Sequence, residues 1–239
     1  MFCPSGSAHG EGLFYARRLP LYICKSTNTL YMSITYLIIG FTCLISFLAF
    51  QNHDIMVKMK HWPYYEQRDG EYYRWLTSGF LHGDPMHLIF NMMALYFFGV
   101  GLELWFEDTF SGFGKTLYVV FYLLAIVAAS SATYFRYRNV SSFASIGASG
   151  AVAAVIFASI LIDPLSSIMF IFLPIPIKGF IFGALYLWYS SYAANRGGDN
   201  IDHTAHFYGA VFGFLFPLIF KPGLLLDFFA QVIAWLQSF

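Results

Sequence analysis

The chain has 239 residues, of which 58% are hydrophobic and only 11% are charged, and its 13 basic residues balance its 13 acidic ones. A water-soluble domain needs about a quarter of its residues charged to cover its surface, so this composition excludes an ordinary soluble protein and favours one solvated by lipid. The balanced charge, without a basic patch, argues against nucleic acid as a partner.

Residues 1–31 form no long apolar run and are predicted to be an N-terminal tail outside the folded core. They lack the pattern of a signal peptide, because no apolar core follows Arg17-Arg18 before Lys25. Met32 opens the first apolar segment directly, which raises a second hypothesis, that residues 1–31 are not part of the native chain. The intact mass of the natively expressed protein separates the two.

Six apolar runs follow, and each is a candidate transmembrane helix. A helix that crosses the hydrocarbon core needs about 20 residues, because each residue adds about 1.5 Å. The runs are 32–50, 85–106, 116–135, 148–162, 179–193 and 204–220, the fourth and fifth being short. The sequence therefore predicts an all-α membrane protein, with a six-helix core over residues 32–221.

Two further segments are expected at the membrane surface. The connection 51–84 mixes charged residues with aromatic ones such as Trp62 and Trp75, a composition typical of helices that lie in the interface. Residues 222–239 are apolar but interrupted by Asp227, which favours an amphipathic C-terminal helix over a seventh span. Lys and Arg are distributed almost evenly between the two sides, so they do not predict the orientation.

Four polar residues inside the apolar runs are functional candidates, because polar groups are costly in lipid. They are His87 and Asn91 in the second run, Ser149 in the fourth and His206 in the sixth. Alternate spans cross the membrane in the same direction, and three of these residues are the second or third of their span. His87, Ser149 and His206 are therefore predicted to lie near one membrane face, at a similar depth.

Small residues four apart allow the fourth and sixth runs to approach closely in lipid. The two stripes are Gly150-Ala154-Ala158 and Ala205-Gly209-Gly213. If the stripes face each other, Ser149 and His206 become neighbours, and a hydroxyl beside an imidazole is the minimum for an activated nucleophile. His87 and Asn91, spaced i and i+4, project from one helix face. With the backbone N–H of Ser149 they are candidates to stabilise an oxyanion.

The fourth run is short for a membrane span, since its fifteen residues rise only about 22 Å against a hydrocarbon core of about 30 Å. The preceding loop, 141–147, is therefore predicted to dip below the surface together with Ser149. Irregular backbone is tolerated at that depth only where it lines a wet cavity.

In this order the motifs resemble the rhomboid family of intramembrane proteases, over residues 32 to about 220. The matching elements are Tyr73-Arg74-Trp75, His87-x-x-x-Asn91, Gly147-x-Ser149-Gly150 and Ala205-His206-x-x-Gly209-x-x-x-Gly213. The resemblance implies a six-helix core whose first connection is half-embedded in the membrane. It also implies that Ser149 is the nucleophile, that His206 is the base, and that His87, Asn91 and the Ser149 backbone form the oxyanion site. The fifth span would then gate lateral entry of the substrate.

The chain departs from the family pattern at two positions. Many members carry Glu-x-Arg near the end of the second span, where this chain has Glu103-Leu104-Trp105. Some members have a Tyr four residues after the nucleophile that stacks on the catalytic His, where this chain has Ala153. We expect either weaker activity or a base positioned by another ring. Glu103 belongs to the opposite membrane face and is expected to have a structural role with loop backbone.

The sequence thus predicts an intramembrane serine endopeptidase that cleaves transmembrane segments and needs no metal or cofactor. Its expected partners are transmembrane-helix substrates and membrane lipids, and its expected location is multi-pass in a bacterial inner membrane. One alternative is a catalytically weak or inactive rhomboid-like protein that binds membrane clients. Others are a metalloenzyme using several histidines, namely His82, His87, His203 and His206, and a small transporter. Asp202, four residues before His206, is a further candidate to orient the base.

Overall fold

The computed structural model describes residues 33–170, 173–196 and 199–239. The predicted tail, residues 1–31, lies outside the described residues, so both hypotheses about it stay predictions.

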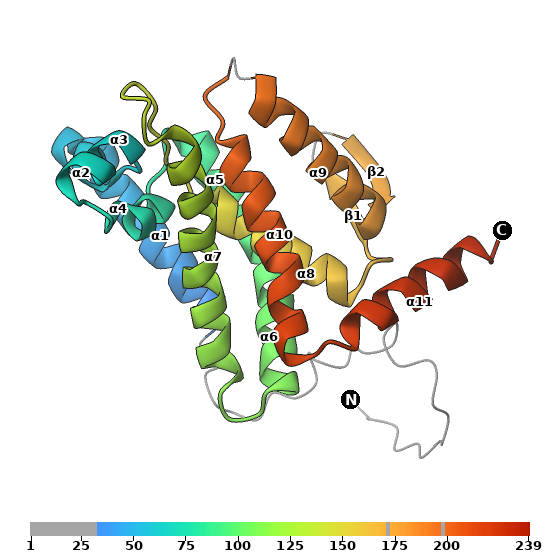
Figure 1. The fold of residues 1–239 in the computed structure, drawn as a ribbon. Coiled ribbons are helices and arrows are strands. Elements are labelled where there is room, and N and C mark those ends of the chain that lie inside the picture. The colour runs from blue at the N-terminus through green and yellow to red at the C-terminus, as the bar shows by residue number, and fades with distance from the viewer. Residues whose placement is uncertain (1–32, 171–172, 197–198) are drawn as a thin grey trace. The chain divides into compact units, whose positions relative to one another are not determined.

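The described chain is mainly helical (Figure 1). Its first half contains α1 (Ile34–Gln51), α2 (His53–Met59), α3 (Pro63–Asp69), α4 (Arg74–Thr77), a 3₁₀ turn (Ser78–Phe80), α5 (Pro85–Ala94), a π-helical turn (Leu95–Gly99), α6 (Val100–Thr109) and α7 (Gly114–Tyr137). Its second half contains α8 (Ser149–Ile162), strands β1 (Ser167–Phe170) and β2 (Leu173–Lys178), α9 (Gly179–Arg196), α10 (His203–Phe220) and α11 (Leu224–Leu236).

Each of the six predicted runs coincides with a helix, and the second run comprises α5, the π turn and α6 in succession. Among the described residues, four helices are long and apolar enough to cross a membrane: α1, Pro85–Thr109, α7 and α10. α8 has 14 residues and is too short by this measure. The fold is therefore that of a helical membrane protein.

Between the fourth and fifth predicted runs, where the all-α prediction allowed for no strand, β1 and β2 pair in antiparallel fashion. Pro174 and Pro176 cannot donate backbone hydrogen bonds within a helix, and β-branched Ile175 and Ile177 favour an extended chain. The apolar composition of this segment concealed the local preference for a strand.

α1 buries its polar side chains and exposes its apolar ones. Thr35, Thr42 and Ser46 are fully buried, whereas Phe41 and Phe47 are 51% and 57% exposed. A soluble helix shows the reverse arrangement. Lipid can cover the apolar face, and polar side chains then hold the helix to its neighbours.

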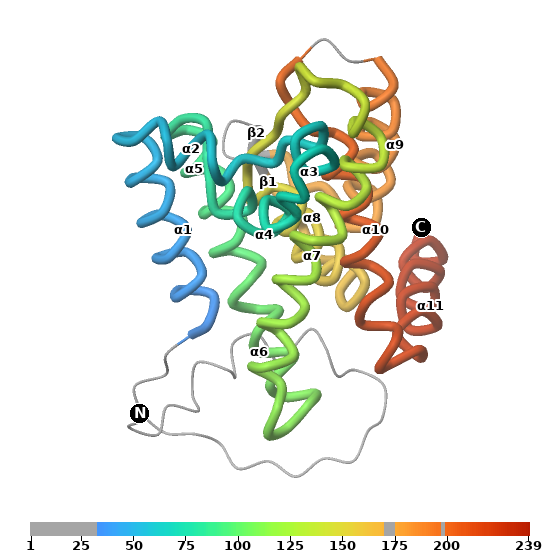
Figure 2. Tube along the Cα trace, turned by 60° about the vertical axis from the view of Figure 1, so that its left-hand side comes forward, coloured from blue at the N-terminus to red at the C-terminus, as the bar shows by residue number. Residues whose placement is uncertain are grey.

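α8 is the central helix of the bundle. It contacts α5, α7, α9 and α10, and most of its side chains from Gly150 to Leu161 are buried. The tube view in Figure 2 shows the surrounding helices from a second direction. A helix surrounded in this way has no polar face, which explains why its sequence is apolar on all sides.

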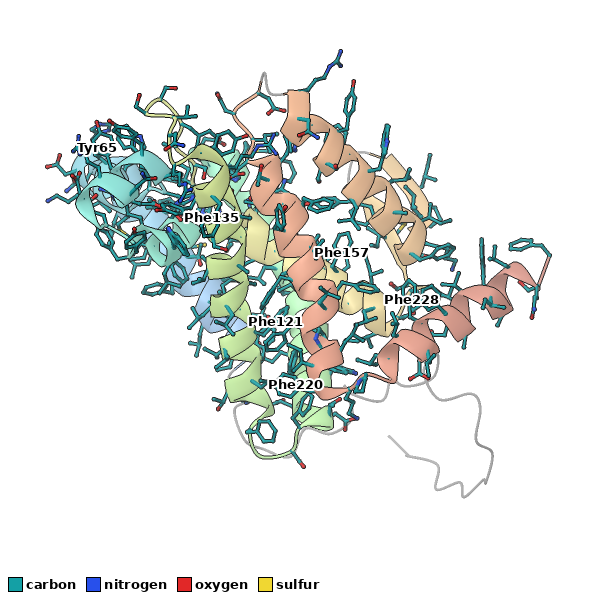
Figure 3. The ribbon with its side chains drawn as sticks, viewed as in Figure 1. Tyr65, Phe121, Phe135, Phe157, Phe220 and Phe228 are labelled. Carbon is teal, nitrogen blue, oxygen red and sulfur yellow. The ribbon has the colours of Figure 1, made fainter. Side chains whose placement is uncertain are left out.

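The two small-residue stripes face each other, as predicted. A Cβ atom added at Gly209 would overlap the carbonyl oxygen of Gly150, and one added at Gly213 would overlap that of Ala154. Elsewhere aromatic rings fill the space between helices, for example Phe121 of α7 against Phe212 and Phe216 of α10 (Figure 3). α8 and α10 are therefore in backbone contact over two helical turns.

Glu103 ties α6 to the start of α1. Its buried carboxylate accepts hydrogen bonds from the backbone N–H groups of Ile34 (2.7 Å) and Thr35 (2.9 Å) and from the hydroxyls of Ser33 (2.6 Å) and Thr35 (2.7 Å). The free N–H groups of a helix N-terminus favour such an anion. The predicted structural role of Glu103 with backbone is confirmed.

We expect Glu103→Ala to lower the free energy of unfolding by about 3 kcal/mol or more, because each buried donor left unpaired costs about 1–3 kcal/mol. Unfolding in detergent micelles measures this loss. Glu107→Ala is the matched control, since Glu107 makes a partly exposed ion pair with Lys115 and should cost less than about 1 kcal/mol. Equal losses in the two variants would contradict the structural role.

We expect Gly209→Ala to lower the free energy of unfolding by about 1–3 kcal/mol, the usual cost of overpacking. The added methyl group would force α10 away from the Gly150 carbonyl. Gly101→Ala on α6 is the control, because a Cβ there meets nothing within 4 Å. An unchanged stability of Gly209→Ala in the same unfolding assay would contradict the close contact.

Candidate active site

Ser149 and His206 are in direct contact. Ser149 is the first residue of α8, His206 is in the first turn of α10, and Ser149 Oγ lies 2.7 Å from His206 Nε2. A neutral imidazole with an unprotonated Nε2 accepts the hydroxyl hydrogen in this geometry. The structure thus brings together two residues that are 57 positions apart in the sequence.

Close packing of α8 on α10 produces this contact. A Cβ at Gly150 would lie 3.3 Å from the carbonyl oxygen of Ala205. Ser149 precedes Gly150 and His206 follows Ala205, so the two side chains leave their helices beside a close approach of the two backbones. The distance between the hydroxyl and the imidazole therefore depends on the small-residue stripes.

Gly147 separates Ser149 from His87. Its φ of +133° is a backbone conformation that favours glycine. A Cβ at this position would lie 2.9 Å from Cε1 of His87 and 3.6 Å from Ser149 Oγ. The serine hydroxyl and the imidazole of His87 thus face the same small space, which the absent side chain leaves open.

Asn91 is buried one turn after His87 on α5. Its amide nitrogen donates to the backbone carbonyl of His87 over 2.9 Å. This nitrogen carries two hydrogens, so one N–H remains beyond the bond within its own helix.

His82 packs against His87. Its Nδ1 lies 3.0 Å from the hydroxyl of Ser46 on α1, and its ring centroid lies 4.9 Å from that of His87. Burial lowers the pKa of His82 to about 3, so its ring is neutral and acts by packing.

The loop before Ser149 is held by the segment between α1 and α5. His61 and Ser145 exchange backbone hydrogen bonds of 3.0 and 2.9 Å, and the N–H of Gly147 donates to the carbonyl of Ser78 over 3.1 Å. The indole of Trp62 donates to the carbonyl of Ser141 over 2.9 Å. The connection 51–84 therefore holds the backbone of the loop that leads into Ser149.

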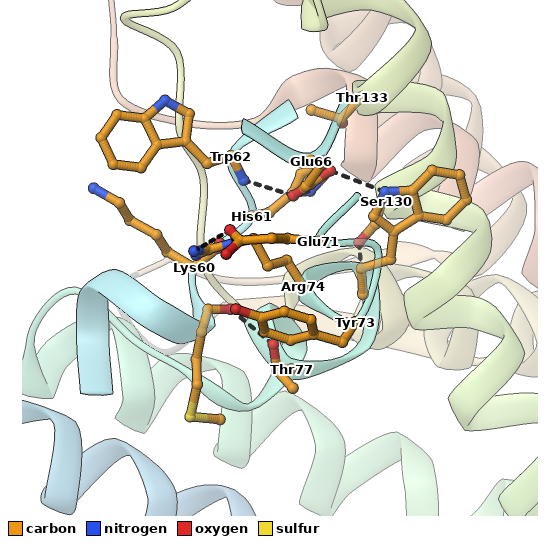
Figure 4. Close-up of polar contacts among 12 residues, drawn as sticks. Lys60, His61, Trp62, Glu66, Glu71, Tyr73, Arg74, Thr77, Ser130 and Thr133 are labelled. Carbon is orange, nitrogen blue, oxygen red and sulfur yellow. Dashed lines mark hydrogen bonds and ion pairs between the residues drawn. The ribbon is translucent and has the colours of Figure 1, made fainter. Parts of the chain in front are cut away.

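A buried carboxylate organises that connection (Figure 4). Glu66 accepts hydrogen bonds from Nδ1 of His61 (2.7 Å), the backbone of Trp62 (2.7 Å) and the indole of Trp75 (2.9 Å). Ser130 of α7 donates to the carbonyl of Trp75 over 2.9 Å. The two tryptophans, expected from sequence only as interfacial residues, thus donate hydrogen bonds that hold the connection and the loop.

Arg74, part of the Tyr-Arg-Trp motif, has a similar role. It forms an ion pair with Glu71 and donates to the carbonyls of Val57 and Lys60. Its side chain is buried to about the same degree as a core residue, at 7% exposed. Arg74 therefore supports the connection and makes no contact with Ser149.

A cavity of about 30 Å³ adjoins Ser149. Its polar lining comes from side chains of five segments, namely His61, Ser78, Ser130, Ser145 and Asp202. This volume holds one or two water molecules, and the lining offers the several polar partners that each requires. Water can therefore reside beside the hydroxyl.

Asp202 does not serve as the partner of the His206 ring. Its carboxylate accepts hydrogen bonds from the hydroxyl of Thr133 (2.8 Å) and from the backbone N–H of Ala205 (2.9 Å). It thus caps α10 and ties it to α7.

The metalloenzyme alternative needs a cluster of metal ligands. Within the described ranges, no three His, Cys, Asp or Glu side chains lie close enough together to hold a metal ion.

The comparisons with known proteins agree with the motifs. A model of the Rhomboid domain matches residues 69–223. The chain belongs to the rhomboid family. Together with its four apolar helices, this membership makes the chain an integral membrane protein.

Three rhomboid relatives show how far the likeness extends. The chain is 28% identical to rhomboid protease GlpG of Haemophilus influenzae over 186 residues, 77% of this chain and 88% of that protein. It is 31% identical to RHOMBOID-like protein 12, mitochondrial, of Arabidopsis thaliana over 154 residues, 60% of this chain and 45% of that protein. It is 29% identical to rhomboid protease AarA of Providencia stuartii over 104 residues, 38% of this chain and 34% of that protein. The match thus spans most of GlpG and less than half of the other two.

One residue of this rhomboid site was missed in the sequence. The ring of Tyr186, on α9, stacks on that of His206 with 6.3 Å between centroids and 29° between planes. The sequence contains a matching pattern that could have pointed to it. Tyr186 and Tyr189 on α9 are three residues apart, and so are His203 and His206 on α10.

We expect Gly147→Ala to slow the reaction of Ser149 with a fluorophosphonate about tenfold or more, because the methyl group would displace His87 from the serine. In-gel fluorescence measures the labelling rate. Gly112→Ala is the control for backbone strain alone, since Gly112 has a φ of +89° and no atom within 4 Å of its Cβ position. If Gly147→Ala labels at the wild-type rate, the space between His87 and Ser149 has no chemical role.

Proposed function

We propose that the chain is an intramembrane serine endopeptidase in which Ser149 is the nucleophile and His206 the base. The observation that carries the proposal is the 2.7 Å hydrogen bond between Ser149 Oγ and His206 Nε2. Two of the relatives, from H. influenzae and P. stuartii, are named proteases. A hydroxyl bonded to a neutral imidazole is the arrangement that acyl transfer by serine requires.

In the first step Ser149 Oγ attacks the carbonyl carbon of the scissile peptide bond while His206 Nε2 takes the hydroxyl proton. The C–N bond then breaks, and the imidazolium returns this proton to the leaving amine. In the second step a water molecule attacks the acyl carbon while it gives a proton to His206 Nε2. The ester C–O bond then breaks, and the imidazolium returns the proton to Ser149 Oγ, which releases the acid product and restores the serine. The polar cavity beside Ser149 supports this step, because it has room for water.

The developing oxyanion is placed among three donors. Ser149 is the first residue of α8, so its backbone N–H belongs to the helix terminus and lacks a partner within the helix. The positive end of the helix dipole favours negative charge there. His87 faces the serine across Gly147, and Asn91 has a second N–H one turn away. These are the groups we assign to the oxyanion site.

The proposed setting is a six-helix membrane core in which α8 and α9 accompany the four helices that are long and apolar enough to cross a membrane. The short α8 then begins inside the bilayer, the connection 51–84 lies in the interface, and α11 lies on the membrane surface. Substrates are transmembrane segments with helix-weakening residues near a small residue at the cut. The bacterial inner membrane is the proposed location, which the two bacterial relatives support. No cofactor enters the proposed reaction.

The alternative is a rhomboid-like protein that binds membrane clients without cutting them. The plant relative is named RHOMBOID-like protein 12, mitochondrial, a name that states no activity. The departure at Trp105 does not favour this alternative. Glu103 already accepts four hydrogen bonds from Ser33, Ile34 and Thr35, so it needs no arginine two residues later. An intact Ser149–His206 contact favours the enzyme.

The test is labelling of the purified protein with a fluorophosphonate, together with cleavage of a transmembrane substrate in proteoliposomes. We expect Ser149→Ala to abolish labelling, and Ser149→Ala or His206→Ala to lower turnover about 10³-fold or more. The matched control is Ser159→Ala on the same helix, whose hydroxyl bonds only its own backbone at Val155 in the described structure. Labelling that persists in Ser149→Ala refutes the assignment. A wild-type protein that binds substrate but neither labels nor cleaves favours the client-binding alternative.

A further inference from the structure

The imidazole of His206 is bordered by two aromatic rings besides its contact with Ser149. Tyr186 stacks over its face, as described above, and the ring of His203 meets it nearly at right angles, with 5.9 Å between centroids and 86° between planes. Both separations lie within the range of favourable aromatic pairs. The orientation of the imidazole is therefore set by its neighbours as well as by the hydrogen bond.

Tyr186 is itself firmly placed. Its ring contacts those of Phe157 on α8 (5.5 Å between centroids) and Phe182 on α9 (5.7 Å). Its hydroxyl forms a hydrogen bond with the side chain of Ser190, which is buried one turn later on the same helix. A ring held on several sides can restrict the ring that it stacks on.

Ala153 is a small residue in the cluster against which Tyr186 packs. It lies one turn after Ser149 on α8 and is buried together with Phe157 and Ala210. A large side chain at position 153 would compete for this space. The chain thus has a small residue on the nucleophile's helix and the aromatic ring on α9.

The second ring, that of His203, is held by Asp199 and by a tyrosine of α9. His203 Nε2 lies 3.0 Å from the carboxylate of Asp199, and its ring meets that of Tyr189 with 5.5 Å between centroids. The hydrogen bond with His203 lowers the pKa of the Asp199 carboxyl below its ordinary value. Two tyrosines of α9, one turn apart, thus contact two histidines of α10, one turn apart.

We infer that Tyr186 is a positioning residue for His206 and that α9 thereby controls the orientation of the base. The inference rests on the proposed function, in which His206 takes and returns the proton of Ser149. Rotation of the imidazole about its own side chain would move Nε2 away from Oγ, and the stacked ring opposes that rotation. Because Ser149 belongs to α8, a displacement of α9 would release the base while leaving the nucleophile in place.

The experiment measures kcat and KM for a transmembrane substrate, and the labelling rate of Ser149, in a set of variants. We expect Tyr186→Ala to lower kcat and the labelling rate about 3- to 10-fold, the range that aromatic stacking energies correspond to, with KM changed less than twofold. Tyr186→Phe keeps the ring and should stay within twofold of the wild type. Tyr186→Ala combined with Ala153→Tyr returns a ring to the neighbourhood of His206 from α8 and should recover most of the lost rate.

The matched control is Tyr192→Ala, since Tyr192 is on the same helix and stacks on Trp188 instead of a histidine. It should leave both rates unchanged. If Tyr186→Ala fails to fold, Tyr186→Leu keeps an apolar side chain against Phe157 and Phe182 and should show the same loss. A folded Tyr186 variant without its ring that retains the wild-type kcat would overturn the inference, as would failure of a folded double variant to recover.

Failure of the inference is distinguishable from failure of the proposed function. Wild-type protein that neither labels at Ser149 nor cleaves the substrate refutes the proposed function. Wild-type protein that does both, beside an equally active Tyr186→Ala, refutes only the positioning role.

Discussion

The close backbone contact between α8 and α10 is the constraint on which the site depends. Gly209 and Gly213 allow α10 to approach the carbonyls of Gly150 and Ala154 more closely than any side chain would permit. In lipid no hydrophobic effect draws helices together, so dispersion between well-matched surfaces must do so. Ser149 and His206 leave their helices beside this contact. The 2.7 Å hydrogen bond between them therefore depends directly on how closely the two helices pack.

Besides the small residues, buried polar groups away from Ser149 and His206 hold the helices together. Glu103 accepts hydrogen bonds from the start of α1, and Ser46 of α1 forms a hydrogen bond with His82. Glu66 accepts hydrogen bonds within the connection 51–84, which holds the loop before Ser149. In the bilayer an unsatisfied polar group is costly, so such bonds favour one arrangement over its competitors. The same reasoning explains why α1 buries Thr42 and exposes Phe41.

The sequence was informative where a residue type is rare in its surroundings. A histidine or serine in an apolar run is a signal because polar groups are costly in lipid, and glycines four apart are a signal because they allow close helix packing. These signals pointed to His87, Ser149 and His206 as candidates. Tyr186 was missed because tyrosine is common in this chain and its partner is on another helix. The β hairpin was missed because an apolar composition fits a buried strand and a helix equally well.

The departure at Ala153 therefore does not by itself indicate a weakened site. Losing a ring from α8 matters only if nothing else restrains the imidazole, and the stack of Tyr186 on His206 supplies that restraint from α9. As a consequence, Ser149 and the ring that restrains His206 belong to different helices, and α9, which carries that ring, packs mainly against α8, α10 and the hairpin. A site built in this way links the orientation of His206 to the position of α9, since the hydroxyl of Ser149 can stay in place when the imidazole does not.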